Sequence, residues 1–126
     1  MLVHLDNSVL IDAFTGRRRS ASPLVDAVSR RDVPTICTIV LYEWLRGPRT
    51  DEERSDVDGF FEREFLASFG EREATTAARL YTQVARARQR QADLAIAACA
   101  IEHGARLWTL NPSDFEDIPG LTLYRP

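Results

Sequence analysis

The sequence contains no lysine, and all 16 of its basic residues are arginine. A Walker A phosphate loop needs a lysine, and so do enzymes that form a Schiff base on a lysine amine, so both classes are excluded. The acidic pockets of phospho-acceptor receiver domains and of haloacid-dehalogenase-type phosphatases also need a lysine, which this chain lacks. Phosphatases of that type further need a second aspartate two residues after the first, where this chain has Ser8 after Asp6.

Long apolar runs are missing too, since none approaches the 18 residues of a membrane span. No basic stretch precedes the first apolar residues, so we expect no signal peptide, a cytoplasmic location and no membrane partner. There are two cysteines, Cys37 and Cys99, and both lie in apolar segments. We expect them to be buried and reduced, with a disulfide between them as the alternative.

The composition suits one domain spanning residues 1–126, because 44% of the residues are hydrophobic. The formal net charge of −3 gives no general affinity for nucleic acid, so any such binding depends on where the arginines lie. Arg17–Arg19 form either a solvated loop or a phosphate-binding one. Arg86, Arg88 and Arg90 follow a predicted helix, where they complement the helix dipole without any further function.

Predicted strands alternate with predicted helices along the chain. This order indicates an α/β domain with a mostly parallel central sheet of four to five strands and helices on both faces. We expect helix starts capped by Asn7 and Ser8, by Ser22 before Pro23, and by a Ser113–Glu116 capping box. The expected strands end at Leu5 and cover 33–37, 65–69, 106–110 and 121–124, and the expected helices cover 9–14, 22–30, 39–46, 50–64, 71–87 and 94–101.

Four acidic residues each lie at or near the start of the element that follows an apolar strand or loop: Asp6, Glu43, Asp93 and Asp114. Each also has an ordinary explanation, because Asp6 and Asp93 could be helix caps and Glu43 a solvated helix residue. In a parallel sheet, however, the carboxyl ends of the strands meet at one edge, where ligands bind. We therefore expect the four carboxylates to gather there.

Carboxylates so close together repel one another, and a divalent cation removes that repulsion. Mg²⁺, or Mn²⁺ in its place, matches a cluster made only of carboxylates. The two histidines, His4 and His103, form no zinc pattern with the cysteines, and we expect His4 to be a packed residue. A carboxylate-bound cation beside arginines suits phosphodiester hydrolysis, with Ser8 positioning a water or ligand by hydrogen bonding rather than attacking.

These residues resemble the motifs of PIN-domain ribonucleases, in particular the VapC-type toxins of bacterial toxin–antitoxin pairs. The resemblance covers essentially the whole chain, and it depends on four motifs in order, none of them specific alone: residues 6–11, 41–47, 93–98 and 109–115. It implies a Mg²⁺-dependent endoribonuclease that forms a homodimer and is silenced by a cognate antitoxin.

The family's functional residues correspond here to Asp6, Glu43, Asp93 and Asp114, with Ser8 in a supporting position. Asn7 stands where Thr or Ser is more usual, which leaves the role of that position open. The remaining polar residues of these motifs are expected to orient the site (Thr109 and Asn111) or to be surface or capping residues (Asp12, Glu116 and Asp117).

Two other functions stay open. One is a catalytically silent PIN-like module that binds RNA or a protein, and the other is a DNA-directed or phosphatase activity on the same metal site. Trp44, Phe60 and Phe61 are candidates for an apolar interface between subunits. The RNA target, the cleavage motif and the number of metal ions do not follow from the sequence.

Overall fold

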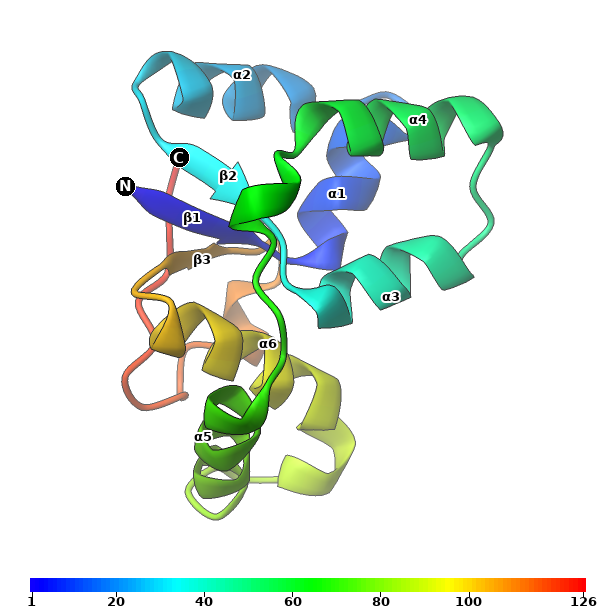
Figure 1. Cartoon of the computed structure of the whole chain (residues 1–126). Helices are drawn as coiled ribbons and strands as arrows, with labels where there is room; N and C mark the ends of the chain where they lie inside the picture. Colours follow the sequence, from blue (N-terminus) through cyan, green and yellow to red (C-terminus); the bar gives the residue numbers. More distant parts are fainter.

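The computed structural model describes all 126 residues and places a parallel sheet between helices (Figure 1). Three short 3₁₀ helices, η1–η3, lie between the main elements. In chain order the elements are β1 (Leu2–Leu5), α1 (Asn7–Phe14), α2 (Ala21–Ser29), β2 (Val33–Thr35), α3 (Thr38–Arg46), α4 (Asp51–Phe60), η1 (Arg63–Phe65), α5 (Glu71–Tyr81), η2 (Ala87–Arg90), α6 (Gln91–Glu102), β3 (Arg106–Trp108) and η3 (Pro112–Asp114).

β1 is the central strand of the sheet, with β2 on one side and β3 on the other, all parallel. Three of its four residues are buried, as expected for a strand that is covered on both faces. Leu5 pairs with Trp108, and the Asp6 amide donates to the Trp108 carbonyl at 2.9 Å. β1 and β3 therefore end side by side, which brings Asp6 next to Thr109.

The sheet has three strands, so the prediction of four to five is wrong. A 3₁₀ turn occupies Arg63–Phe65, and the segment 65–69 contributes only one bridge, between Ala67 and Cys37. The segment 121–124 likewise pairs only at Leu123, which bridges to Leu107. Both segments run beside the parallel sheet, but neither keeps the pairing beyond one residue.

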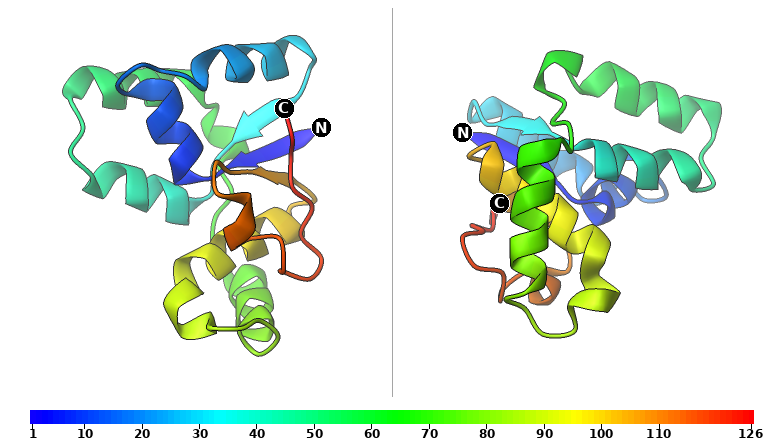
Figure 2. Two further views of the ribbon diagram at one scale, coloured as in Figure 1. Left: turned by 180° about the vertical axis from the view of Figure 1, so that it is seen from behind. Right: turned by 60° about the horizontal axis from the view of Figure 1, so that its bottom comes forward.

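Helices cover both faces of the sheet, as predicted. Figures 1 and 2 show α1, α2 and α4 on one side of the strands and α5 and α6 on the other. α6 has seven consecutive buried residues, Leu94–Ala100, which confirms that it is a central helix. Burial of each Leu or Ile side chain contributes about 1.5–3 kcal/mol, so the core fixes the helix that carries Asp93.

The start of α1 differs from the prediction. Asp6 itself is the N-cap, with an extended backbone at φ −73° and ψ 157°, and its Oδ1 accepts from the Asn7 amide at 2.8 Å. Asn7 and Ser8 are already helical, so they do not cap the helix. The carboxylate at the end of β1 therefore stabilises the first turn of α1.

Two other predicted caps are also wrong. α2 begins at Ala21, before Ser22, and the hydroxyl of the preceding Ser20 donates to Asp12 at 2.6 Å instead of capping the helix. The Ser113–Glu116 capping box does not form, because the chain makes only a 3₁₀ helix there. In both cases the same residues also allow another local structure, an earlier helix start at Ala21 or a 3₁₀ helix at Pro112–Asp114, and the folded chain adopts that one.

The boundaries around α6 differ in a way that affects the site. α6 begins at Gln91, so Asp93 lies in its first turn and is not its cap. α5 ends at Tyr81 rather than at residue 87. Arg86 has a left-handed backbone at φ +53°, which cannot belong to the interior of a right-handed helix. The chain turns there and enters η2.

The predicted apolar interface is wrong for Trp44, which is only 1% exposed and lies beneath the Arg49 guanidinium at 4.3 Å. Phe60 and Phe61 pack against each other and against Phe14 within the domain. The two cysteines are buried and free, as predicted. None of the helices is both long and apolar enough to cross a membrane.

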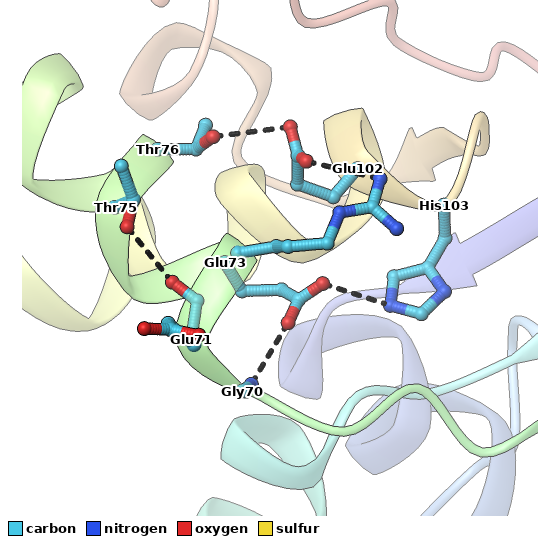
Figure 3. Close-up of polar contacts among 8 residues, drawn as sticks. Gly70, Glu71, Glu73, Thr75, Thr76, Glu102 and His103 are labelled. Carbon is cyan, nitrogen blue, oxygen red and sulfur yellow. Dashed lines mark hydrogen bonds and ion pairs between the residues drawn. The ribbon is translucent and has the colours of Figure 1, made fainter.

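A polar network joins α5 to the C-terminal end of α6 (Figure 3). Glu73 accepts from the Gly70 amide at 2.9 Å and lies 3.5 Å from His103 Nε2, while the Thr76 hydroxyl donates to Glu102 at 3.0 Å. These contacts lie at the end of α6 opposite to Asp93. The network therefore fixes the packing of the two helices and lies outside the candidate site.

His4 lies in the core, as predicted. Its ring is 5.7 Å from the ring of His103, and neither of its nitrogens has a hydrogen-bond partner. Burial, with a smaller contribution from His103, lowers the pKa of His4 to about 4. The side chain is therefore a neutral packing residue at neutral pH.

Candidate active site

Asp6 is the most firmly held acid of the site. It is 8% exposed, and both of its carboxylate oxygens accept hydrogen bonds. Oδ1 accepts from the Asn7 amide, and Oδ2 accepts from the hydroxyls of Thr109, at 2.8 Å, and Ser8, at 3.0 Å. The capping interpretation and the functional one are thus compatible, since one oxygen caps α1 and the other faces two hydroxyls.

The two hydroxyls also tie the loop after β3 to α1. Ser8 Oγ accepts from the Leu110 amide at 3.1 Å, and Thr109 Oγ1 accepts from the Asn111 amide at 3.0 Å. The hydroxyl hydrogen of Ser8 is therefore directed to Asp6 while its oxygen accepts from the main chain. This arrangement suits a supporting role, in which Ser8 orients the Asp6 carboxylate and the main chain of the loop after β3.

Glu43 lies in α3, which packs against both α1 and α6. Its side chain is 18% exposed, so the interpretation as a fully solvated helix residue does not hold. Burial, and then the negative charges of Asp6 and Asp93, raise the pKa of Glu43. The Arg46 guanidinium, 3.9 Å away, opposes this effect only in part.

Asp93 projects from the first turn of α6 and has no hydrogen bond or ion pair to its side chain. Burial, followed by the charges of Asp6 and Asp114, raises its pKa to about 6, and Arg90 opposes the shift. The structure therefore brings Asp6, Glu43 and Asp93 within electrostatic reach of one another, although they come from three different elements.

Asp114 lies at the rim of this group. It is exposed in η3 and raises the pKa of Asp93, but it makes no contribution to that of Glu43. Asp93 and Asp114 line a cavity of about 450 Å³. The other polar residues that line this cavity are Arg86, Gln89, Arg90, Ser113 and Asp117.

The donor chemistry of the site fits Mg²⁺, although no group of three or more His, Cys, Asp or Glu side chains is arranged to hold a metal ion. Mg²⁺ usually keeps several waters and is bound through one or two carboxylates together with substrate phosphates. A complete cage of protein ligands is therefore not required. The raised pKa values of Glu43 and Asp93 also indicate negative charge that the protein itself leaves uncompensated.

Sequence reasoning missed the ion pair between Arg90 and Asp117, whose atoms approach to 2.6 Å. Arg90 was explained by the helix dipole and Asp117 as a surface or capping residue. The two lie 27 residues apart, and no local pattern connects them. Asp12, also expected at the surface or in a cap, accepts from Ser20 instead.

Comparison with known proteins extends over the whole chain. It is similar to a chain in the structure of VapBC2 from Rickettsia felis bound to a promoter DNA fragment, with 23% identity, 98% of each chain covered and a TM-score of 0.76. For DNA-bound VapBC from Salmonella typhimurium the values are 22%, 98% of each chain and 0.76. For a toxin–antitoxin complex from Klebsiella pneumoniae they are 25%, 98% of this chain and 99% of that one, and 0.73.

A comparison with curated proteins gives no match. The family model for the PIN domain, in contrast, matches residues 3–121. That match includes β2, β3, all of β1 except Leu2, all six α-helices and the four acidic residues described above. The chain belongs to the PIN domain family.

Proposed function

We propose that this protein is a Mg²⁺-dependent endoribonuclease, the toxin of a type II toxin–antitoxin pair, which hydrolyses RNA phosphodiester bonds with water as the nucleophile. PIN domain proteins are typically nucleases, and those nucleases generally use a divalent metal. The observation that carries the proposal is that Asp6, Glu43 and Asp93 come together from three elements, where burial and then the charge of Asp6 raise the pKa of both Glu43 and Asp93.

The residues that would hold Mg²⁺, or Mn²⁺ as a substitute, are Asp6, Glu43, Asp93 and Asp114. When bound, the ion supplies Lewis-acid chemistry, which makes hydroxide available near neutral pH and neutralises charge on the phosphate. Ser8 and Thr109 keep the Asp6 carboxylate in a single orientation through their hydroxyl hydrogen bonds. The hydrogen bonds of the Ser8 hydroxyl on both sides support a positioning role for Ser8, with water as the proposed nucleophile.

Two exposed arginines near these acids can bind the RNA backbone. Arg86 lines the same cavity as Asp93 and Asp114, is exposed, and makes no hydrogen bond or ion pair through its side chain. Arg46 lies beside Glu43 at 3.9 Å and is 59% exposed. Guanidinium groups bind phosphate oxygens in a two-pronged way, so both residues can hold phosphates next to the scissile one.

The substrate class is tested by side-by-side digestion of single-stranded RNA, single-stranded DNA and a phosphate monoester, each with and without Mg²⁺. We expect cleavage within the RNA chain only when Mg²⁺ is present. Cleavage of DNA or of the monoester at an equal or higher rate would replace this function with one of its alternatives. Binding of RNA without any cleavage would indicate a silent binding module.

The partner side of the proposal is supported by the toxin–antitoxin complexes among the similar structures. We propose that a cognate antitoxin covers the acidic site and that the free toxin is a homodimer. Expression of this chain with and without the neighbouring open reading frame tests the pairing. We expect growth arrest by the chain alone and relief by the neighbour, whereas growth without arrest in both cases would contradict a toxin.

A further inference from the structure

Arg90 uses all four of its Nη hydrogens on acceptors within the protein. Nη1 donates to the Ala85 carbonyl at 3.0 Å and to Asp117 Oδ2 at 2.8 Å. Nη2 donates to the Asp114 carbonyl at 2.9 Å and to Asp117 Oδ1 at 2.6 Å. A guanidinium has five N–H groups, so only the Nε hydrogen remains. Arg90 is therefore occupied, whereas Arg86 in the same cavity is free for substrate.

These contacts connect two segments that each carry an acid of the site. Arg90 directly precedes α6, and Asp93 follows three residues later in the first turn of that helix. Asp114 and Asp117 belong to the segment after β3. The Arg90 side chain is 16% exposed and the Asp117 side chain 50% exposed, so water reaches the connection mainly from the Asp117 side. One guanidinium thus sets the distance between the start of α6 and the main chain at Asp114.

Asp114 depends on this connection more than the other acids do. Asp6 is held by three hydrogen bonds to its carboxylate, but the exposed carboxylate of Asp114 accepts none. The residue is fixed through its backbone, where its amide donates to the Asn111 carbonyl at 3.0 Å and its carbonyl accepts from Arg90. Loss of the Arg90 contact would leave the position of this carboxylate poorly defined.

We propose that Arg90 is a positioning residue for the metal site, which holds the Asp114 segment so that its carboxylate can reach a cation bound at Asp6 and Asp93. This inference depends on the proposed function. The two-pronged pair with Asp117 neutralises the guanidinium, which lets a positive side chain remain near a cation site. Arg90 acts through Asp114 and does not itself contact the ion or the RNA.

A positioning role and a purely electrostatic role of Arg90 predict opposite changes in metal affinity when Arg90 is replaced. A guanidinium near a cation site repels the cation, so if only its charge mattered, Arg90→Gln would tighten metal binding. If Arg90 positions Asp114, the same substitution weakens metal binding. Arg90→Lys distinguishes the two roles a second time. It keeps the charge, so an electrostatic role predicts unchanged metal binding, but one ammonium group cannot donate to the same four acceptors, so a positioning role predicts weaker binding.

The test is an electron paramagnetic resonance titration of the full chain with Mn²⁺ alone. We expect Arg90→Gln and Arg90→Lys to raise the Kd for Mn²⁺ by about 10-fold or more, the range seen for residues that orient metal ligands. Arg88→Gln and Arg88→Lys are the matched controls, since Arg88 is exposed and its side chain makes no hydrogen bond or ion pair within the chain. Tighter or unchanged Mn²⁺ binding in either Arg90 variant would overturn the proposal.

Two further measurements keep the outcomes distinct. Thermal melting shows whether the Arg90 variants fold, and Arg90→Lys remains informative if Arg90→Gln does not. Failure of the wild-type chain to bind Mn²⁺ would contradict the proposed function itself, whereas normal wild-type binding with unaffected Arg90 variants would contradict only the positioning role. We also expect the RNA cleavage rate of Arg90→Lys to recover when Mg²⁺ is raised about 10-fold, a recovery that a folding defect would not give.

Discussion

Asp93→Asn should stabilise the metal-free protein at neutral pH. The Asp93 carboxylate makes no hydrogen bond or ion pair, so the substitution removes a charge without removing a contact. Its pKa rises from 3.8 to about 6 on folding, because of burial and the nearby charges of Asp6 and Asp114. The folded protein therefore binds the proton more tightly than the unfolded chain, and stability falls as the pH rises from 3.8 to 6.

The size of the effect follows from this pKa difference. Each pKa unit corresponds to about 1.4 kcal/mol, which gives an upper limit of about 3 kcal/mol for the full difference. Asp93 is only half-buried, and solvent screening reduces this value, so we expect a gain of about 1–2 kcal/mol at pH 7.5. At pH 4 the gain should fall to about a fifth of that value, because Asp93 is then protonated in the folded state and about half protonated in the unfolded chain.

Urea denaturation of the two proteins at pH 7.5 and at pH 4, with a chelator present, measures this difference. Asp58→Asn is the control, since Asp58 is exposed in α4 and makes no ion pair or hydrogen bond through its side chain. We expect a change below about 0.5 kcal/mol for that control. An Asp93→Asn protein that is less stable than the wild type at pH 7.5, or a gain as large at pH 4 as at pH 7.5, would refute the reasoning.

Three other substitutions test separate parts of the structure. Thr109→Val removes the hydroxyl that donates to Asp6 at 2.8 Å, and thermal denaturation should show a loss of about 2 kcal/mol, with slower RNA cleavage at limiting Mg²⁺. The pKa of His4 falls from 6.5 to about 4 on folding, so His4 alone should lower the stability by about 3 kcal/mol between pH 7 and pH 4, partly offset by protonation of Glu43 and Asp93, and His4→Leu should remove the His4 contribution in urea titrations at the two pH values. Thr50→Ala breaks the capping box with Glu53 and should cost about 1 kcal/mol in chemical denaturation while RNA cleavage stays unchanged; an equal loss of cleavage would contradict the separation of α4 from the site.

The sequence was most informative where an uninterrupted apolar run begins or ends at a polar residue. The apolar run up to Leu5 followed by Asp6 predicted the end of β1, and the continuous apolar run from Leu94 predicted a central helix. Both features depend on burial, which a single segment of sequence expresses directly. Strand length was predicted poorly, because it depends on a partner elsewhere in the chain. The segments 65–69 and 121–124 have the composition of strands, but each pairs at only one residue.

The candidate site was predictable in its residue types and their order along the chain, and less so in its geometry. The sequence left open whether Asp6 is a helix cap or a site residue, whereas its two oxygens serve both the helix and the site. The ion pair of Arg90 with Asp117 depends on η2 and η3 lying side by side, which only the folded chain decides. The predicted cap at Ser22 is wrong because α2 begins one residue earlier, at Ala21. The residue before it, Ser20, donates its hydroxyl to Asp12, which is close only in the folded chain.

The most direct test is the rate of RNA cleavage by wild-type and Asp6→Asn proteins across a range of Mg²⁺ concentrations. Asparagine also caps helices well, so the variant should fold, with a Tm lowered because Ser8 and Thr109 lose the carboxylate oxygen that accepts their hydroxyls. We predict cleavage that rises with Mg²⁺ in the wild type and no cleavage above background in the variant. An Asp6→Asn protein that still cuts RNA when Mg²⁺ is added would contradict the assignment of these acids to a metal-dependent nuclease site.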